Sequence, residues 1–83
     1  MQPTHYEYGV SDLGLASALS CLGFQIKALN RDNPRRVVFL FEGEQQRIDK
    51  TVKEFWEGTL KLPASSLFLH QKSLKQRLYA DNL

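Results

Sequence analysis

The segment "RVVFLFE" at positions 36–42 limits most strongly what this chain can fold into. A run of β-branched and aromatic residues is typical of a strand. In that strand Val37, Phe39 and Phe41 would point to one side, and Val38 and Leu40 to the other. Because both sides are apolar, we expect cover on both faces. A lone hairpin in water cannot provide it, so the segment predicts a sheet packed by helices.

A partner for this strand lies just before it in the sequence. The segment "FQIKALN" at 24–30 alternates, which places Phe24, Ile26 and Ala28 on one side. The intervening "RDNPRR" has turn residues and is too short for a parallel crossover, so we expect an antiparallel hairpin. The segment "TLKL" at 59–62 is a candidate for a short third strand.

Helical periodicity fills most of the remaining sequence. Ser11 is a suitable N-cap for a helix to about Leu22, and Gly23 would end it, with Phe24 folding back onto the helix. A second helix is predicted over 44–57, ended by Gly58, and a third from Pro63 to about Tyr79. The expected buried faces are Leu15, Ala18, Leu19 and Leu22 in the first, Ile48, Val52, Phe55 and Trp56 in the second, and Leu67, Gln71, Leu74 and Leu78 in the third.

These elements predict an α+β fold of one small domain, because the chain length leaves room for a single core. The expected order is α-β-β-α-α, with a two- or three-stranded antiparallel sheet packed by helices. We assign residues 11–83 to this domain and residues 1–10 to an N-terminal arm. So short a chain is marginally stable alone, which makes oligomerisation a live alternative.

The charge distribution is uneven, although the net charge is only +2. The first residues, 1–23, carry Glu7 and Asp12 and no Lys or Arg. Residues 59–83 hold the largest local excess of cations: Lys61, Lys72, Lys75 and Arg77 against Asp81. On the predicted second helix, by contrast, Lys and Glu or Asp are spaced as solvated i, i+4 pairs.

The last predicted helix carries a second face beside its apolar one. Phe68, Lys72, Lys75 and Tyr79 fall within a band about 60° wide. Lysines between aromatic rings suit a nucleic acid, with Lys on phosphates and rings stacked on bases. In the alternative interpretation, the rings widen the buried face and the lysine stems pack along it.

The predicted hairpin turn raises the same two possibilities. Arg31, Arg35 and Arg36 are placed to contact phosphates, or else they keep a strand end soluble. If the turn and the last helix share one face, the nucleic-acid interpretation gains at both places. The candidate contacts are then Arg31, Arg35, Arg36, Lys72, Lys75, Arg77, Phe68 and Tyr79.

Catalytic and cofactor motifs are missing from the sequence. It has no Gly-rich phosphate loop, nucleophile elbow or HExxH, so we expect no enzyme activity and no cofactor. His5 with Glu7 and Asp12 lacks the rigid spacing of metal ligands, so no metal site is expected. We interpret His70 as a partly buried packing residue, because no carboxylate near it in sequence would orient it as a base.

Targeting signals and cysteine content favour the cytoplasm. Cys21 is the only cysteine, which rules out an internal disulfide framework and a zinc module, and we interpret it as a packing residue. The start of the sequence has no secretory pattern, and no apolar run approaches the length of a membrane span. We therefore expect a cytoplasmic protein with no membrane partner.

Four segments, "SDLGLASALSCLGF", "RVVFLFEG", "FWEGTL" and "LKQRLY", resemble a family of short bacterial and phage domains of unknown function. The resemblance spans residues 11–79 and implies a helix, a hairpin and two further helices, with no assigned enzyme activity. Leu62 departs from the family, which usually has a polar residue before the proline that opens the last helix. No functional residue is implied by the resemblance.

Two functional hypotheses follow. The first is a non-enzymatic, nucleic-acid-associated accessory module whose candidate residues bind mostly phosphate. The alternative is a protein-interaction module or homodimer, in which the edge of the apolar second strand pairs across a two-fold axis.

Overall fold

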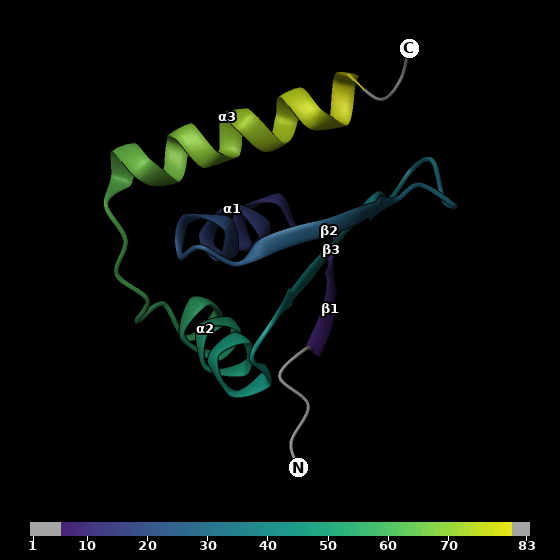
Figure 1. Cartoon of the computed structure of the whole chain (residues 1–83). Helices are drawn as coiled ribbons and strands as arrows, with labels where there is room; N and C mark the ends of the chain where they lie inside the picture. Colours follow the sequence, from purple (N-terminus) through teal and green to yellow (C-terminus); the bar gives the residue numbers. More distant parts are fainter. Residues whose placement is uncertain (1–5, 81–83) are drawn as a thin grey trace.

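The computed structural model describes residues 6–80 and confirms the α+β class. The described residues form, in order, β1 (Tyr6–Val10), α1 (Leu13–Cys21), β2 (Gln25–Asn30), β3 (Val38–Gly43), α2 (Gln45–Glu57) and α3 (Ala64–Ala80). The three helices gather on one side of a twisted sheet, and α3 packs against α1 (Figure 1). The order therefore has one strand more than predicted, at its start.

The sheet has the order β1-β3-β2, and both pairings are antiparallel. The predicted hairpin of β2 and β3 is confirmed. Residues 6–10, which we assigned to an arm, instead form β1 and pair with β3, with Tyr8 opposite Phe41. The predicted strand at 59–62 is wrong, since this segment is irregular.

This topology removes one form of the alternative hypothesis. β3 is the second strand of the predicted hairpin, and we expected its edge to pair with another chain. Because β1 and β2 occupy both of its edges, β3 has no backbone edge to offer. The outer edges of the described sheet belong to β1 and β2.

The core lies on one face of the sheet only. Phe39 and Phe41 are fully buried there against Leu19 of α1, Ile48 of α2 and Leu74 of α3. Val38 and Leu40, on the opposite face, are half-buried and lie outside this cluster. The prediction of cover on both faces is therefore wrong, because the buried residues of all three helices cluster with Phe39 and Phe41 on the other face.

A β-bulge changes the phase of β2. Ile26 pairs with Phe41, but the next paired residue is Ala28, opposite Leu40, so Lys27 is the extra residue. After the bulge Leu29, opposite Phe39, packs against the core, while Ala28 is exposed. The predicted alternation therefore holds for Phe24 and Ile26 and fails at Ala28.

The helix ends follow the predicted turn chemistry, with one shift. The N-cap of α1 is Asp12 rather than Ser11, since the Asp12 carboxylate accepts a hydrogen bond from the Leu15 N–H at 2.9 Å. At the other end Gly23 has φ +93°, and the Phe24 N–H bonds to the Leu19 carbonyl, which confirms the predicted fold-back. Gly58 ends α2 in the left-handed region as predicted.

The buried faces of the helices are mostly as predicted. Leu74 is buried, and Leu67, Gln71 and Leu78 are half-buried beside it. Two residues depart from the prediction: Leu22 is exposed beyond the end of α1, and Trp56 is 63% exposed at the margin of the α2 face. Thr51, which the apolar pattern passed over, is buried and donates its hydroxyl to the Arg47 carbonyl.

Candidate nucleic-acid interface

The second face of α3, formed by Phe68, Lys72, Lys75 and Tyr79, is exposed, and we refer to these four residues as the α3 stripe. Phe68 is 65% exposed and Tyr79 is 69% exposed. The packing interpretation, in which both rings widen the buried face, is therefore wrong. A surface with two cations between two exposed rings is present on the folded chain.

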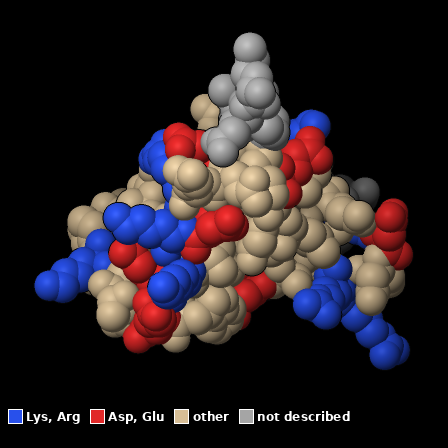
Figure 2. All heavy atoms as spheres, turned by 90° about the horizontal axis from the view of Figure 1, so that it is seen from below, with Lys and Arg blue, Asp and Glu red and all other residues tan. Residues whose placement is uncertain are grey.

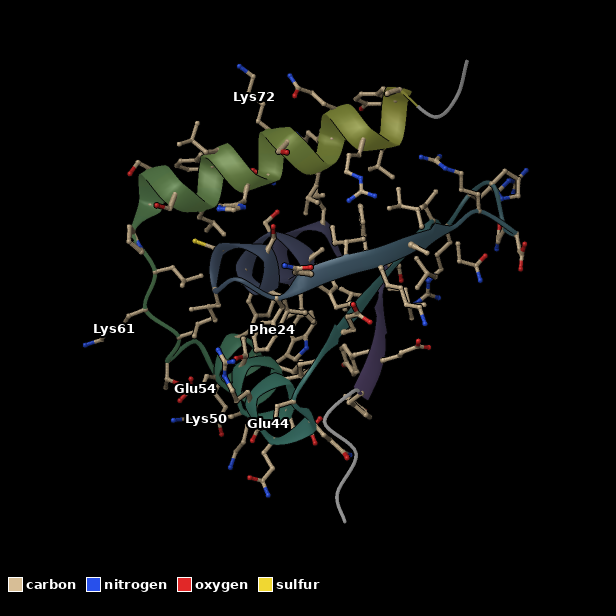
Figure 3. All side chains as sticks on the ribbon, viewed as in Figure 1. Phe24, Glu44, Lys50, Glu54, Lys61 and Lys72 are labelled. Carbon is tan, nitrogen blue, oxygen red and sulfur yellow. The ribbon has the colours of Figure 1, made fainter. Side chains whose placement is uncertain are left out.

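The contacts on the other side of α3 explain why the α3 stripe faces outward. Leu74 and Leu78 pack into the core, and the His70 Nδ1 lies 3.0 Å from the Ser20 hydroxyl of α1. This contact confirms His70 as a partly buried residue between two helices. At 100° per residue the stripe lies about 80–140° around the helix from Leu67, and Lys72 points away from the molecule (Figure 3).

α3 carries cations and no carboxylate from Ala64 to Ala80. Lys72 and Lys75 belong to the α3 stripe, while Arg77 falls about 170° from its centre by helical geometry. Arg77 is exposed but on the opposite flank of the helix, so it does not share a surface with the two lysines.

Arg31 connects the hairpin to the end of α3. Its guanidinium donates hydrogen bonds to the carbonyls of Arg77 and Leu78, each at 3.2 Å, and the residue is half-buried. A cation suits this position because the last carbonyls of a helix are unpaired and carry partial negative charge. Arg31 is thus a structural residue that places the hairpin beside the C-terminal end of α3, where Tyr79 lies.

The other two hairpin arginines point to different surroundings. Arg36 Nε donates to the Ser11 hydroxyl at 2.8 Å, on the side of the β1 to α1 connection. Arg35 is exposed within the turn, where its backbone N–H bonds to the Asn33 side chain at 3.0 Å. The predicted set therefore separates: Arg31 stabilises the fold, Arg36 contacts Ser11, and Arg35 remains a surface cation of the hairpin.

The carboxylates that we considered as metal ligands have structural partners. Glu7 forms an ion pair with Lys27 across the open face of the sheet, and Asp12 caps α1. The hydrogen bond from Lys27 to the Glu7 carboxylate, together with its negative charge, raises the pKa of Lys27. His5 lies outside the described residues, and within 6–80 no group of His, Cys, Asp or Glu converges as a metal site requires.

Surface hollows that the sequence did not predict lie away from the α3 stripe. A hollow of about 230 Å³ between the helices is lined by Ala18, Phe55, Leu60, Leu62 and Leu67. Another, of about 350 Å³, includes Tyr8, Arg36 and the exposed Trp56. The position of Trp56 at the edge of the apolar face of α2 is the sequence signal for the second hollow, since a large ring at such an edge is often only partly covered.

Across residues 6–80, no helix is long and apolar enough to cross a membrane. No curated protein and no solved structure matches the chain. One family model does match, over residues 5–80, which extends past the predicted resemblance at both ends. With nearly the whole chain matched, and with the small helix-and-sheet architecture described above, the chain belongs to the family of domains of unknown function DUF5659.

Proposed function

We propose that this domain is a non-enzymatic accessory module that binds the phosphate backbone of nucleic acid through the α3 stripe and the hairpin turn. The observation that carries the proposal is an exposed helix face with cations, aromatic rings and no carboxylate. On this model Lys72 and Lys75 contact phosphates, and Arg35 contributes a further cation from the turn.

The fold supports this arrangement by holding the two elements together. Arg31 ties the hairpin to the carbonyls that end α3, so that the turn and the last turn of the stripe are neighbours. Arg77 and Arg36 are left out of the proposed contact set because they face other sides. Phosphate contacts of this kind position a ligand and carry little sequence information.

The number of cations predicts how strong the binding is. Three phosphate contacts give a slope of about −2 to −3 for the logarithm of the binding constant against the logarithm of salt concentration. We therefore expect weak, salt-sensitive binding, which suits an accessory component of a larger assembly in the cytoplasm.

The test is an amide NMR titration of the whole chain with mixed-sequence single- and double-stranded DNA and RNA at low salt. Shifts should be confined to α3 and the hairpin turn and should weaken at physiological salt. The variant Lys72→Glu with Lys75→Glu should lose binding. The matched control is Lys50→Glu with Lys53→Glu on α2, which changes charge equally and should bind as the parent does.

Arg35→Glu should weaken binding without unfolding the domain, and Arg36→Glu is left out because Arg36 contacts Ser11. Unchanged spectra with all four nucleic acids would overturn the proposal. Equal losses in the α3 and α2 variants would also count against it, since net charge alone would then explain the binding.

A homodimer is the second candidate. Because β3 is the central strand, we propose that the dimer would pair through the edge of β1 instead. β1 has an outer edge without a strand partner among the described residues, and the hollow with Trp56 lies beside it. Sedimentation at high concentration tests this candidate. A strictly monomeric particle would exclude it.

A further inference from the structure

We infer that the ligand of the α3 stripe is a single strand rather than a duplex, an inference that rests on the proposed function. The rings at the two ends of the stripe, Phe68 and Tyr79, are each about two-thirds exposed, at 65% and 69%. Two lysines lie between them on the same face of the helix. The stripe therefore presents two cations between two rings along one line.

The rings distinguish the two kinds of nucleic acid. In a duplex the base faces are stacked on one another, and a protein meets phosphates, sugars and groove edges. An exposed ring gains little from those groups, whereas it stacks directly on an unpaired base. Two lysines alone would serve a duplex equally well, so the rings are what selects the single strand.

The spacing of the rings sets the length of the strand. Phe68 and Tyr79 are separated along α3 by a rise of about 16 Å, at 1.5 Å per residue. Stacked nucleotides advance about 3.4 Å along a strand, so this rise spans about five steps. We infer a site of about six nucleotides, with a base on each ring and the lysines on the phosphates between them.

The experiment is a fluorescence anisotropy titration of the whole chain. The probes are labelled oligothymidylates of about three, six and twelve nucleotides, which have no stable self-structure, and a mixed-sequence duplex of about twelve base pairs. Affinity should rise steeply to about six nucleotides and only gradually beyond that length. The duplex should bind at least about fivefold more weakly than the longest single strand.

Ring variants test the mechanism. Phe68→Ala and Tyr79→Ala should each weaken the single strand at least about fivefold and leave the duplex unchanged. Tyr79→Phe keeps the ring and should bind as the parent does. The matched control is Leu69→Ala, since Leu69 is 68% exposed on the same helix but lies outside the stripe. Circular dichroism verifies that each variant is folded.

The outcomes separate this inference from the proposed function. Equal affinity for the longest single strand and for the duplex, unaffected by the ring variants, would overturn the inference and leave backbone binding intact. If neither the single strands nor the duplex bound at low salt, both the inference and the proposed function would be overturned. A loss in Leu69→Ala as large as in Phe68→Ala would also overturn it, because general apolar contact would then replace stacking.

Discussion

α2 and α3 follow one another in the chain but have different surface patterns. α2 buries Ile48 and Thr51, keeps Val52 and Phe55 half-buried, and alternates cations with carboxylates on its outer side. Figure 2 shows Lys and Arg interspersed with Asp and Glu on the side where α2 lies. α3 fully buries only Leu74 and exposes Phe68, Leu69 and Tyr79 beside cations, with no carboxylate within the helix.

The difference between the two helices separates a surface pattern that folding explains from one that it does not. The α2 pattern is the one that stability favours: an apolar side inward and a balanced outer side. Rings on α3 that leave about two-thirds of their surface exposed contribute little to the core and lower solubility, so stability does not explain them. Departures from folding rules of this kind are expected where a surface has a function.

The largest expected effect comes from the residues that anchor each helix. Ile48→Ala in α2 and Leu74→Ala in α3 should each lower the free energy of unfolding by about 2–5 kcal/mol, because both side chains are buried in the shared core. Urea denaturation followed by circular dichroism measures this. A loss below about 1 kcal/mol for Leu74→Ala would mean that α3 is docked only loosely.

A second pair of variants compares two phenylalanines directly. Phe55 of α2 is half-buried and packs edge-on against Trp56, with ring centroids 4.9 Å apart. Phe55→Ala should lower the free energy of unfolding by about 1–3 kcal/mol, whereas Phe68→Ala should change it by less than about 0.5 kcal/mol. Thermal unfolding of both variants checks this. Equal losses would place Phe68 in the core and remove the contrast between the helices.

A smaller effect is expected at the contact between α3 and the hairpin. Arg31→Met keeps the apolar stem but removes the hydrogen bonds to the Arg77 and Leu78 carbonyls, and should cost about 1 kcal/mol. Hydrogen exchange should also accelerate in the last turn of α3. Arg35→Met, in the exposed part of the same turn, is the control, and an equal effect there would argue against the structural role of Arg31.

The smallest effect on stability is expected from an exposed ion pair, whose size also indicates what the exposed charges on α2 contribute. Lys27 and Glu7 form an exposed ion pair that raises the pKa of Lys27, so the stabilisation is present at neutral pH and is lost as the pH rises through that pKa. The melting temperature should differ slightly between the parent and Lys27→Gln at neutral pH. This difference in melting temperature should vanish at a pH well above the ordinary lysine pKa of about 10.4. A difference that grows as the pH rises would contradict the prediction.

Sequence patterns predicted the elements with strong local signals. The hairpin and the glycine-terminated helices depend on residues close together in the chain, whereas the sequence left open whether the band on α3 is exposed or packed. Trp56 and Phe68 each lie at least about 80° from the centre of their apolar faces, where both are exposed. From the sequence, exposure was considered for Phe68 but not for Trp56. Periodicity locates the centre of a buried helix face, but it does not show how far neighbouring elements cover that face on either side.

Other features depend on partners that the local sequence does not identify. "YEYGV" is short and contains Gly9, and it becomes a strand because β3 has an edge to pair with it. The bulge at Lys27 shifts Ala28 outward without any glycine or proline to mark it. Arg31 and Arg36 differ in role because of hydrogen bonds to residues far away in the chain, on α3 and before α1.

The place of β3 between two strands of different origin also has a consequence for the order of folding. β2 and β3 meet across a short turn, whereas β1 pairs with β3 over the whole of α1 and β2, with Tyr6 opposite Gly43. Closing the longer loop costs more entropy, so the hairpin should form early and β1 should join late. During synthesis β1 would leave the ribosome before β3 and yet be the last of these three strands to find its partner, and until then the edge of β3 that it covers would stay open to strands of other chains.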